Sequence, residues 1–263
     1  MSGIDPREAT VVVTGAGSGI GAATARGYAQ AGAVVACVDI DGEAAARTAA
    51  ECGPRARHAV CDVADWAAVK ALAEWAAGEL GPVDVLVNNA GVGVGGPFLE
   101  ASVEDWEWLR SINLDGVVHG CRAFAPPMLE RRRGHVVNVA SQAGFMATRR
   151  LAMYCATKAA VLHLSRCLRA DWAAAGVGVS AICPGVINTS IYEASRVHGV
   201  SDRDHSLVGR AFARGHPPEA VADAIIAAAR RNRGVVPVGW EARVAFQVLR
   251  VTPGPIQNLL ARV

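Results

Sequence analysis

Short runs of β-branched and other apolar residues alternate, through the first two thirds of the chain, with longer alanine-rich stretches of helical spacing. Near-continuous apolar strands separated by helices are typical of a parallel sheet covered on both faces. Right-handed crossovers then give a doubly wound α/β fold, a three-layer sandwich with about seven parallel strands. We expect strands at 10–14, 34–38, 57–61 (the weakest), 83–87, 136–139 and 177–182, and helices at 22–31, 65–80, 154–174 and 219–231.

Composition bounds the class of protein. Apolar residues make up 52% of the 263 positions and charged residues 19%, which is enough for one large core. The composition does not shift along the chain, so we expect a single domain over 1–263. A net charge of +2 argues against nucleic acid as a partner, and the lack of a long uncharged apolar run argues against a membrane span.

The N-terminus, the cysteines and the less regular segments indicate the cellular location and the variable parts of the chain. The N-terminus lacks the pattern of a signal peptide and the seven cysteines form no CxxC pair, which predicts a cytoplasmic protein. The seven histidines include no HExxH motif, so we expect no metal. A polar, weakly periodic stretch at 190–218 is predicted to be a variable substrate loop, and 235–263 forms a C-terminal tail.

The segment Thr14–Gly21, with the sequence TGAGSGIG, joins the first expected strand to a helix. Glycines there allow a tight turn and let a pyrophosphate approach the helix N-terminus, where free N–H groups and the dipole favour an anion. The position after a strand and before a helix favours a dinucleotide site over a simple structural turn. The expected contact residues are Gly15, Gly17, Ser18, Gly19, Ile20 and Gly21.

The second expected strand ends at Asp39, about 20 residues after the glycines. A carboxylate at this position accepts hydrogen bonds from the adenosine ribose and repels a 2′-phosphate. No Arg or Lys lies in the glycine loop or directly after Asp39, so we expect NAD as the cofactor and consider NADP less favoured. Asp41 is the better candidate for capping the next helix.

Tyr154 and Lys158 are four residues apart in a stretch expected to be helical, so both lie on one helix face. A nearby ammonium stabilises a phenolate, and we therefore expect Lys158 to lower the pKa of Tyr154 and make it a usable proton donor or acceptor. Ser141 ends a buried strand, at the carboxyl edge where α/β sites form.

These motifs together resemble the short-chain dehydrogenase/reductase family, of the standard-length, NAD-preferring type, with a Rossmann-type fold. The resemblance runs from about residue 10 to 189. It implies that Tyr154 exchanges the proton, Ser141 holds the substrate oxygen, and Lys158 binds the nicotinamide ribose. It also implies that Asn113 kinks its helix and supports a water relay to Lys158. The motifs are TGxxxGIG at 14–21, Asp62-Val63, Asn88-Asn89-Ala90-Gly91, Asn113, Ser141, Tyr154 with Lys158, and Pro184-Gly185 followed by Thr189.

The resemblance implies further cofactor contacts and an assembly. Asp62 and Val63 would meet the adenine, Asn89 the cofactor floor, and Ile187 and Thr189 the carboxamide. A homotetramer or homodimer is expected. The remaining expected cofactor-binding residues are Ala90, Gly91, Pro184 and Gly185.

The family pattern leaves the substrate open. We expect a substrate pocket above the carboxyl ends of the strands, with the 190–218 segment as its roof and residues after the cofactor-floor and Ser141 motifs as its lower wall. The apolar residues of this roof and wall favour a medium-sized apolar secondary alcohol or ketone as the substrate. Arginines beside them leave an anionic substrate, such as a hydroxyacyl compound or sugar acid, as the alternative; a non-catalytic NAD-binding protein or a sugar-nucleotide epimerase is less favoured. The roof residues are Ile191, Tyr192, Val197, Val200, Leu207, Val208 and Phe212, the wall residues Val92, Val94, Phe145 and Met146, and the arginines Arg149, Arg150, Arg196 and Arg203.

Overall fold

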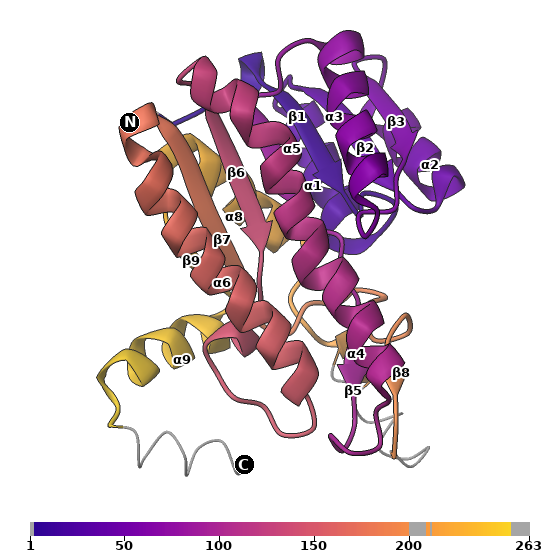
Figure 1. Ribbon diagram of the computed structural model, residues 1–263, viewed down its shortest axis with the longest axis vertical. Coiled ribbons are helices and arrows are strands. Elements are labelled where there is room, and N and C mark those ends of the chain that lie inside the picture. The colour runs from indigo at the N-terminus through magenta and orange to yellow at the C-terminus, as the bar shows by residue number, and fades with distance from the viewer. Residues whose placement is uncertain (1–2, 200–208, 211, 254–263) are drawn as a thin grey trace.

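The computed structural model describes residues 3–199, 209–210 and 212–253, and its centre is a seven-stranded parallel sheet of order β3-β2-β1-β4-β6-β7-β9 (Figure 1). The strands β2 and β3 follow β1 on one side, and β4, β6, β7 and β9 follow on its other side, so the strand order reverses between β1 and β4. Such a reversal leaves a crevice at the carboxyl ends of the strands. The strands are β1 Thr10–Thr14, β2 Val34–Asp39, β3 Ala56–Val60, β4 Val85–Asn88, β6 Gly134–Val139, β7 Val177–Pro184 and β9 Val235–Val238.

Helices cover both faces of this sheet and confirm the three-layer arrangement (Figure 1). These helices are α1 Gly19–Gln30, α2 Gly42–Cys52, α3 Trp66–Leu80, α5 Gly116–Glu130, α6 Ala152–Trp172 and α8 Pro218–Arg231. Two further helices, α4 Val103–Arg110 and α9 Trp240–Val251, lie below the sheet in Figure 1. Shorter turns of 3₁₀ helix lie at Pro6–Glu8, Gln142–Gly144 and Ala173–Ala175, and a π-helical turn lies at Ser111–Asp115. No helix of the described residues is long and apolar enough to cross a membrane.

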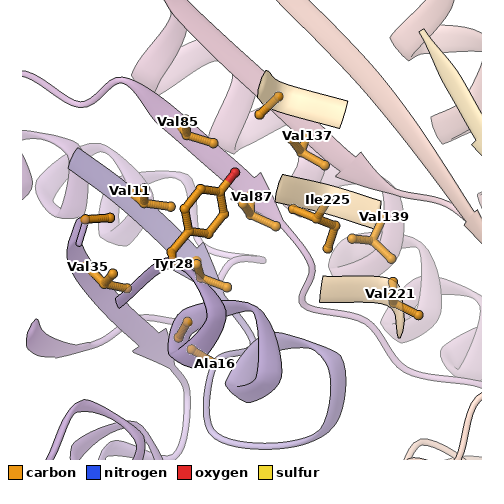
Figure 2. Close-up of a cluster of buried hydrophobic side chains, with 14 of the residues drawn as sticks. Val11, Ala16, Tyr28, Val35, Val85, Val87, Val137, Val139, Val221 and Ile225 are labelled. Atoms are coloured by element: carbon orange, nitrogen blue, oxygen red, sulfur yellow. The ribbon is translucent and has the colours of Figure 1, made fainter. Parts of the chain in front are cut away.

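Two apolar clusters, one on each face, hold the layers together. Alternate residues of a strand point to opposite faces, so Val11 belongs to one cluster and Val12 to the other. The first cluster joins α1 and α8 to the sheet, and Figure 2 shows Tyr28 and Ile225 meeting the strand valines there. The second joins α3, α5 and α6 to the opposite face.

The C-terminal tail supplies the last strand of the sheet, at a position for which the sequence had indicated no strand. β9 pairs only with β7, and Pro237 is tolerated because an edge strand has a free side that needs no N–H donor. The tail then forms α9, whose Val244, Val248 and Val251 are exposed. Part of the expected loop at 190–218 is also ordered: β8 Arg196–Val197 pairs in parallel with β5 Val94–Gly95.

Local signals explain where the main elements begin. Asp41 caps α2, as expected, because its side chain accepts a hydrogen bond from the Ala44 N–H at 3.0 Å. Ser102 and Asp105 form a reciprocal capping box at the start of α4. The expected strand at 83–87 begins two residues later, at Val85, and α6 begins at Ala152, two residues before the expected start.

Candidate active site

A cavity of about 710 Å³ opens at the carboxyl ends of the central strands. It brings together residues that are as far apart in the sequence as Gly15 and Thr189. Of the expected site residues, those that line it are Gly15, Ser18, Gly19, Ile20, Asp39, Asp62, Val63, Asn89, Ala90, Gly91, Ser141, Tyr154, Lys158, Pro184, Gly185, Ile187 and Thr189. Gly17, Gly21 and Asn113 are not among the lining residues, but each contacts a residue that is.

The glycine loop has the geometry that a dinucleotide requires. Gly15 and Gly19 adopt φ of +64° and +50°, a left-handed backbone that other residues rarely take. A Cβ on Gly21 would collide with the carbonyl oxygen of Gly15, so the loop and the first turn of α1 are in direct contact. No side chain at these glycines stands between the cavity and the N-terminus of α1, and the loop therefore fits a pyrophosphate.

Asp39 lies at the carboxyl end of β2, beside the glycine loop. Its Oδ2 accepts a hydrogen bond from the Gly17 N–H at 2.8 Å, and its Oδ1 accepts one from the Asp41 N–H at 3.1 Å. A Cβ on Gly17 would lie 2.8 Å from the same Oδ2, which explains why glycine is needed there. The carboxylate is thus held at the edge of the cavity by two backbone donors and fits a ribose diol.

Asn89 joins the end of β4 to the glycine loop. Its Nδ2 donates to the Thr14 carbonyl oxygen at 2.9 Å, and its backbone N–H donates to the Thr14 hydroxyl at 3.0 Å. Thr14 in turn donates its hydroxyl to the Val87 carbonyl oxygen at 3.3 Å. These bonds hold the glycine loop after β1 against the segment after β4. The two strands are neighbours at the point where the strand order reverses.

Ser141, Tyr154 and Lys158 meet at the same cavity. Ser141 follows the end of β6, and Tyr154 and Lys158 lie one turn apart on α6, with Lys158 Nζ 5.8 Å from the centre of the Tyr154 ring. Lys158 is buried and donates from Nζ to the Val139 carbonyl oxygen at 3.1 Å. The side chains that the sequence predicts to hold and protonate a substrate oxygen therefore line the same cavity as the glycine loop.

Asn113, for which the resemblance implied a helix kink, lies in the π-helical turn between α4 and α5. Its side chain is fully buried and forms a two-bond pair with Val92: Oδ1 accepts from the Val92 N–H at 2.8 Å and Nδ2 donates to the Val92 carbonyl oxygen at 2.9 Å. An ideal Cβ on Gly91 would lie 3.2 Å from Asn113 Oδ1 and 3.4 Å from Lys158 Nζ. Asn113 thus fixes the wall beside Lys158.

The expected lowering of the Tyr154 pKa is wrong for this structure. Burial raises the pKa of Tyr154 to about 12, and a hydrogen bond with Ser141 offsets only part of that rise. Burial also lowers the pKa of Lys158 to about 8, because the charged ammonium has lost its water and Cys183 nearby compensates only in part. Each group is shifted toward its neutral form, because desolvation is the largest cause of both pKa shifts.

The substrate end of the cavity agrees with the expected lining only in part. Val92, Val94, Ile191, Tyr192, Val197 and Phe212 line it, but Phe145 and Met146 are not among the lining residues. Phe145 packs instead edge-on against Phe246 of α9, with ring centres 5.2 Å apart, a contact that no local pattern predicted. Val200, Leu207 and Val208 lie outside the described residues.

The expected arginines separate into two groups. Arg149 and Arg150 line the cavity. Arg196 does not, because it pairs with Asp105 at 3.0 Å and stacks on Trp108 at 3.9 Å from the ring centre. Arg203 lies outside the described residues. The sequence reasoning missed four polar lining residues, of which Gln142 and Thr148 follow Ser141 closely, whereas Ser190 and Ser195 lie within the expected substrate loop without a signal of their own.

The fold and the cavity together define a dinucleotide-binding α/β protein, and comparison with known proteins specifies the family. The chain matches the family model described as short chain dehydrogenase over residues 9–198. A crystal structure of a short-chain dehydrogenase/reductase from Burkholderia phymatum in complex with NAD is similar, with a TM-score of 0.85, 33% identity and 94% of each chain covered. The chain belongs to the short-chain dehydrogenase/reductase family, for which a nicotinamide cofactor is supported.

Curated relatives carry oxidoreductase names. The probable oxidoreductase EphD of Mycobacterium tuberculosis is 42% identical over 259 residues, which is 94% of this chain and 44% of that protein. The chain thus spans less than half the length of that relative. D-threitol dehydrogenase of Mycolicibacterium smegmatis is 45% identical over 183 residues, covering 68% of this chain and 70% of the relative. Meso-2,3-butanediol dehydrogenase of Serratia marcescens is 41% identical over 182 residues, covering 69% and 72%.

Proposed function

We propose that the protein is an NAD-dependent oxidoreductase that interconverts a secondary alcohol and a ketone, with Tyr154 as the general acid and base. The observation that carries this proposal is the convergence of Ser141, Tyr154 and Lys158 on the cavity that the glycine loop borders. The names of the relatives, a threitol dehydrogenase and a butanediol dehydrogenase among them, support the same class of reaction.

In this proposal each of the four residues of the site has a separate role. The hydroxyl of Ser141 holds the substrate oxygen, and the Tyr154 phenol gives that oxygen a proton in ketone reduction or takes one in alcohol oxidation. Lys158 binds the cofactor ribose through its ammonium, and Asn113 keeps the neighbouring wall fixed through Val92. The nicotinamide, when bound, supplies or accepts the hydride.

Asp39 supports NAD over NADP. Its two oxygens are directed by backbone donors, and no cationic side chain of the described residues forms an ion pair with it. A 2′-phosphate beside this carboxylate would place like charges together in a partly buried site. The 2′-hydroxyl of NAD can instead donate a hydrogen bond to it.

We propose a medium-sized, mainly apolar substrate because aliphatic and aromatic side chains form most of the inner end of the cavity. One observation favours the alternative, an anionic substrate: Arg149 and Arg150 line the cavity, and no ion pair holds either of them within the described part of the chain. Salt distinguishes the two, since steering by exposed arginines weakens steeply with ionic strength.

The first experiment is a panel of secondary alcohols with NAD or NADP, with absorbance of the reduced cofactor as the readout. The panel pairs alicyclic alcohols with hydroxy acids of similar size, at low and high salt. We expect oxidation of the apolar alcohols, NAD preferred, and little dependence on salt. Turnover of the acids alone, lost at high salt, would favour the anionic alternative. Failure to bind NADH at all would refute the proposed function.

Assembly and location stay predictions. We propose a homotetramer or homodimer in the cytoplasm, and light scattering of the purified protein tests the first part. A monomer at micromolar concentration would contradict it.

A further inference from the structure

Glu241, in the first turn of α9, contacts the loop that follows β7. Its Oε1 accepts a hydrogen bond from the Val186 N–H at 3.0 Å. The carboxylate also lies directly against Gly185, where a Cβ would collide with Oε1. Gly185, Val186 and Ile187 all line the cavity. A side chain from the C-terminal tail is therefore bonded to the back of the cavity wall.

His216 joins the same cluster from a third segment. Its Nε2 lies 2.9 Å from Glu241 Oε2. Its backbone binds the wall on both sides, because its N–H donates to the Val186 carbonyl oxygen at 2.9 Å and its carbonyl oxygen accepts from the Asn188 N–H at 2.9 Å. The wall loop, the segment before α8 and the first turn of α9 thus meet at one carboxylate. Figure 1 shows α9 below the sheet.

The cluster is packed and charged. Gly239 has φ of +97°, and a Cβ there would lie 2.8 Å from Glu241 Oε1 and 3.0 Å from His216. Burial acts to raise the pKa of Glu241, but the hydrogen bonds from His216 and from backbone N–H groups outweigh it and hold the pKa below its ordinary value. The side chain is therefore a carboxylate at neutral pH, which strengthens its bond to the Val186 N–H.

We propose that Glu241 is a positioning residue for the nicotinamide end of the cofactor, acting through the backbone of residues 185–187. The inference rests on the proposed function, in which Ile187 and Thr189 meet the carboxamide. Glu241 lies outside residues 9–198, which match the family model, so the family match assigns it no part in the site. It touches the wall from behind and is not a catalytic residue.

Loss of the Glu241 carboxylate should affect the nicotinamide half of the cofactor and not the adenosine half. Asp39 and the glycine loop, which in the proposed function hold the adenosine and the pyrophosphate, make no hydrogen bond with Glu241 in the described part of the chain and lie at other strands. Removing the carboxylate should release the wall loop locally. Affinity for NADH should fall while affinity for ADP-ribose, which has no nicotinamide, should not.

The experiment compares Glu241→Ala with Glu241→Gln and Glu241→Asp, and uses Gln247→Ala, an exposed residue of the same helix, as the matched control. NADH affinity and the emission of the bound reduced nicotinamide come from fluorescence titration, and ADP-ribose affinity from calorimetry. We expect Glu241→Ala to weaken NADH about tenfold, the effect of losing one charge-assisted hydrogen bond, and to dim its bound emission. ADP-ribose should bind as in the wild type.

The other variants keep the test decisive. Glu241→Gln retains an oxygen for the Val186 N–H and should restore most of the NADH affinity. If Glu241→Ala does not fold, Glu241→Asp, whose shorter side chain cannot reach both partners, carries the same expectation. Equal losses for NADH and ADP-ribose, or no loss for either, would overturn the inference and leave the proposed function intact. A wild type that binds neither ligand would refute the proposed function, and the inference with it.

Discussion

Lys158 gives a prediction that separates function from stability. Its ammonium is buried, and no carboxylate in the described part of the chain pairs with it; its hydrogen bond goes to the Val139 carbonyl oxygen. Burial lowers its pKa from 10.5 to about 8. The protein must therefore stabilise a charge in a dry site at neutral pH, and replacing Lys158 by Met should relieve that cost.

The size of the effect follows from the two pKa values. At about 1.4 kcal/mol per pH unit, the difference of roughly 2.5 corresponds to about 3 kcal/mol of lost stability at pH 7. Lys158→Met leaves the Val139 carbonyl oxygen without its donor, which costs about 1 kcal/mol. We expect the variant to be more stable than the wild type by about 2 kcal/mol at pH 7, and to lose turnover and NAD affinity.

The sign of the pH dependence is fixed. Between pH 8 and 10.5 the unfolded chain binds a proton at Lys158 that the folded protein does not, so the wild type gains stability as the pH rises. Its unfolding free energy, measured in urea, should rise relative to the variant's across this window. Lys70, the only other lysine in the sequence, is exposed, and Lys70→Met is the control that should show no such trend. A Lys158→Met protein less stable than wild type at pH 7, or a difference that stays flat with pH, would refute the reasoning.

Three more predictions address the cofactor and the proton. Tyr154→Phe should lower kcat by about 10²–10⁴-fold in steady-state assays and leave NADH affinity unchanged; near-normal turnover would remove Tyr154 from the reaction. Asp39→Ser should weaken NAD and improve NADP by about 1–3 kcal/mol in kcat/KM, and an unchanged ratio would contradict the assignment of the ribose contact. Burial raises the pKa of all three tyrosines, Tyr28, Tyr154 and Tyr192, so the folded, cofactor-free protein should show less phenolate absorbance at pH 10 than the unfolded chain, in which about half of the tyrosines are ionised; equal absorbance of the two states would contradict it.

The sequence was sufficient for the features that depend on local pattern. Continuous apolar runs marked five of the sheet's seven strands, and the glycines marked the loop between β1 and α1, because both signals lie within a few neighbouring residues. The weaker strand expected at 57–61, which is not continuously apolar, corresponds to β3. The seventh strand, β9, was missed since VVPV contains a proline and is short. Only its place at the edge beside β7 makes that proline acceptable.

Contacts between distant segments could not be predicted in this way. Phe145 follows Ser141 closely and was expected in the substrate wall, but α9 brings Phe246 against it and removes it from the cavity. Arg196 was a candidate for substrate recruitment until the fold placed Asp105 and Trp108 beside it. In both cases the residue type suited the expected role, but a partner distant in sequence decided where the side chain lies. Phe246 and Asp105 are 91 or more positions away from Phe145 and Arg196, respectively.

The pKa shifts of Tyr154 and Lys158 also could not be predicted from the sequence. The spacing of four residues does place both side chains on one face of α6, but it carries no information on how much water each retains. The neighbours of Lys158 include Val139 at the end of β6 and Gly91 in the loop after β4, which Asn113 of the π turn also contacts, and all are distant from α6 in sequence. Desolvation then moves both pKa values toward the neutral forms, upward for the phenol and downward for the ammonium. A ligand that accepts hydrogen bonds from Lys158 Nζ would raise the pKa of Lys158, and an ammonium that stays charged over a wider pH range would favour the phenolate of Tyr154. The proton transfer that we propose for Tyr154 therefore depends on the bound cofactor as well as on the four-residue spacing.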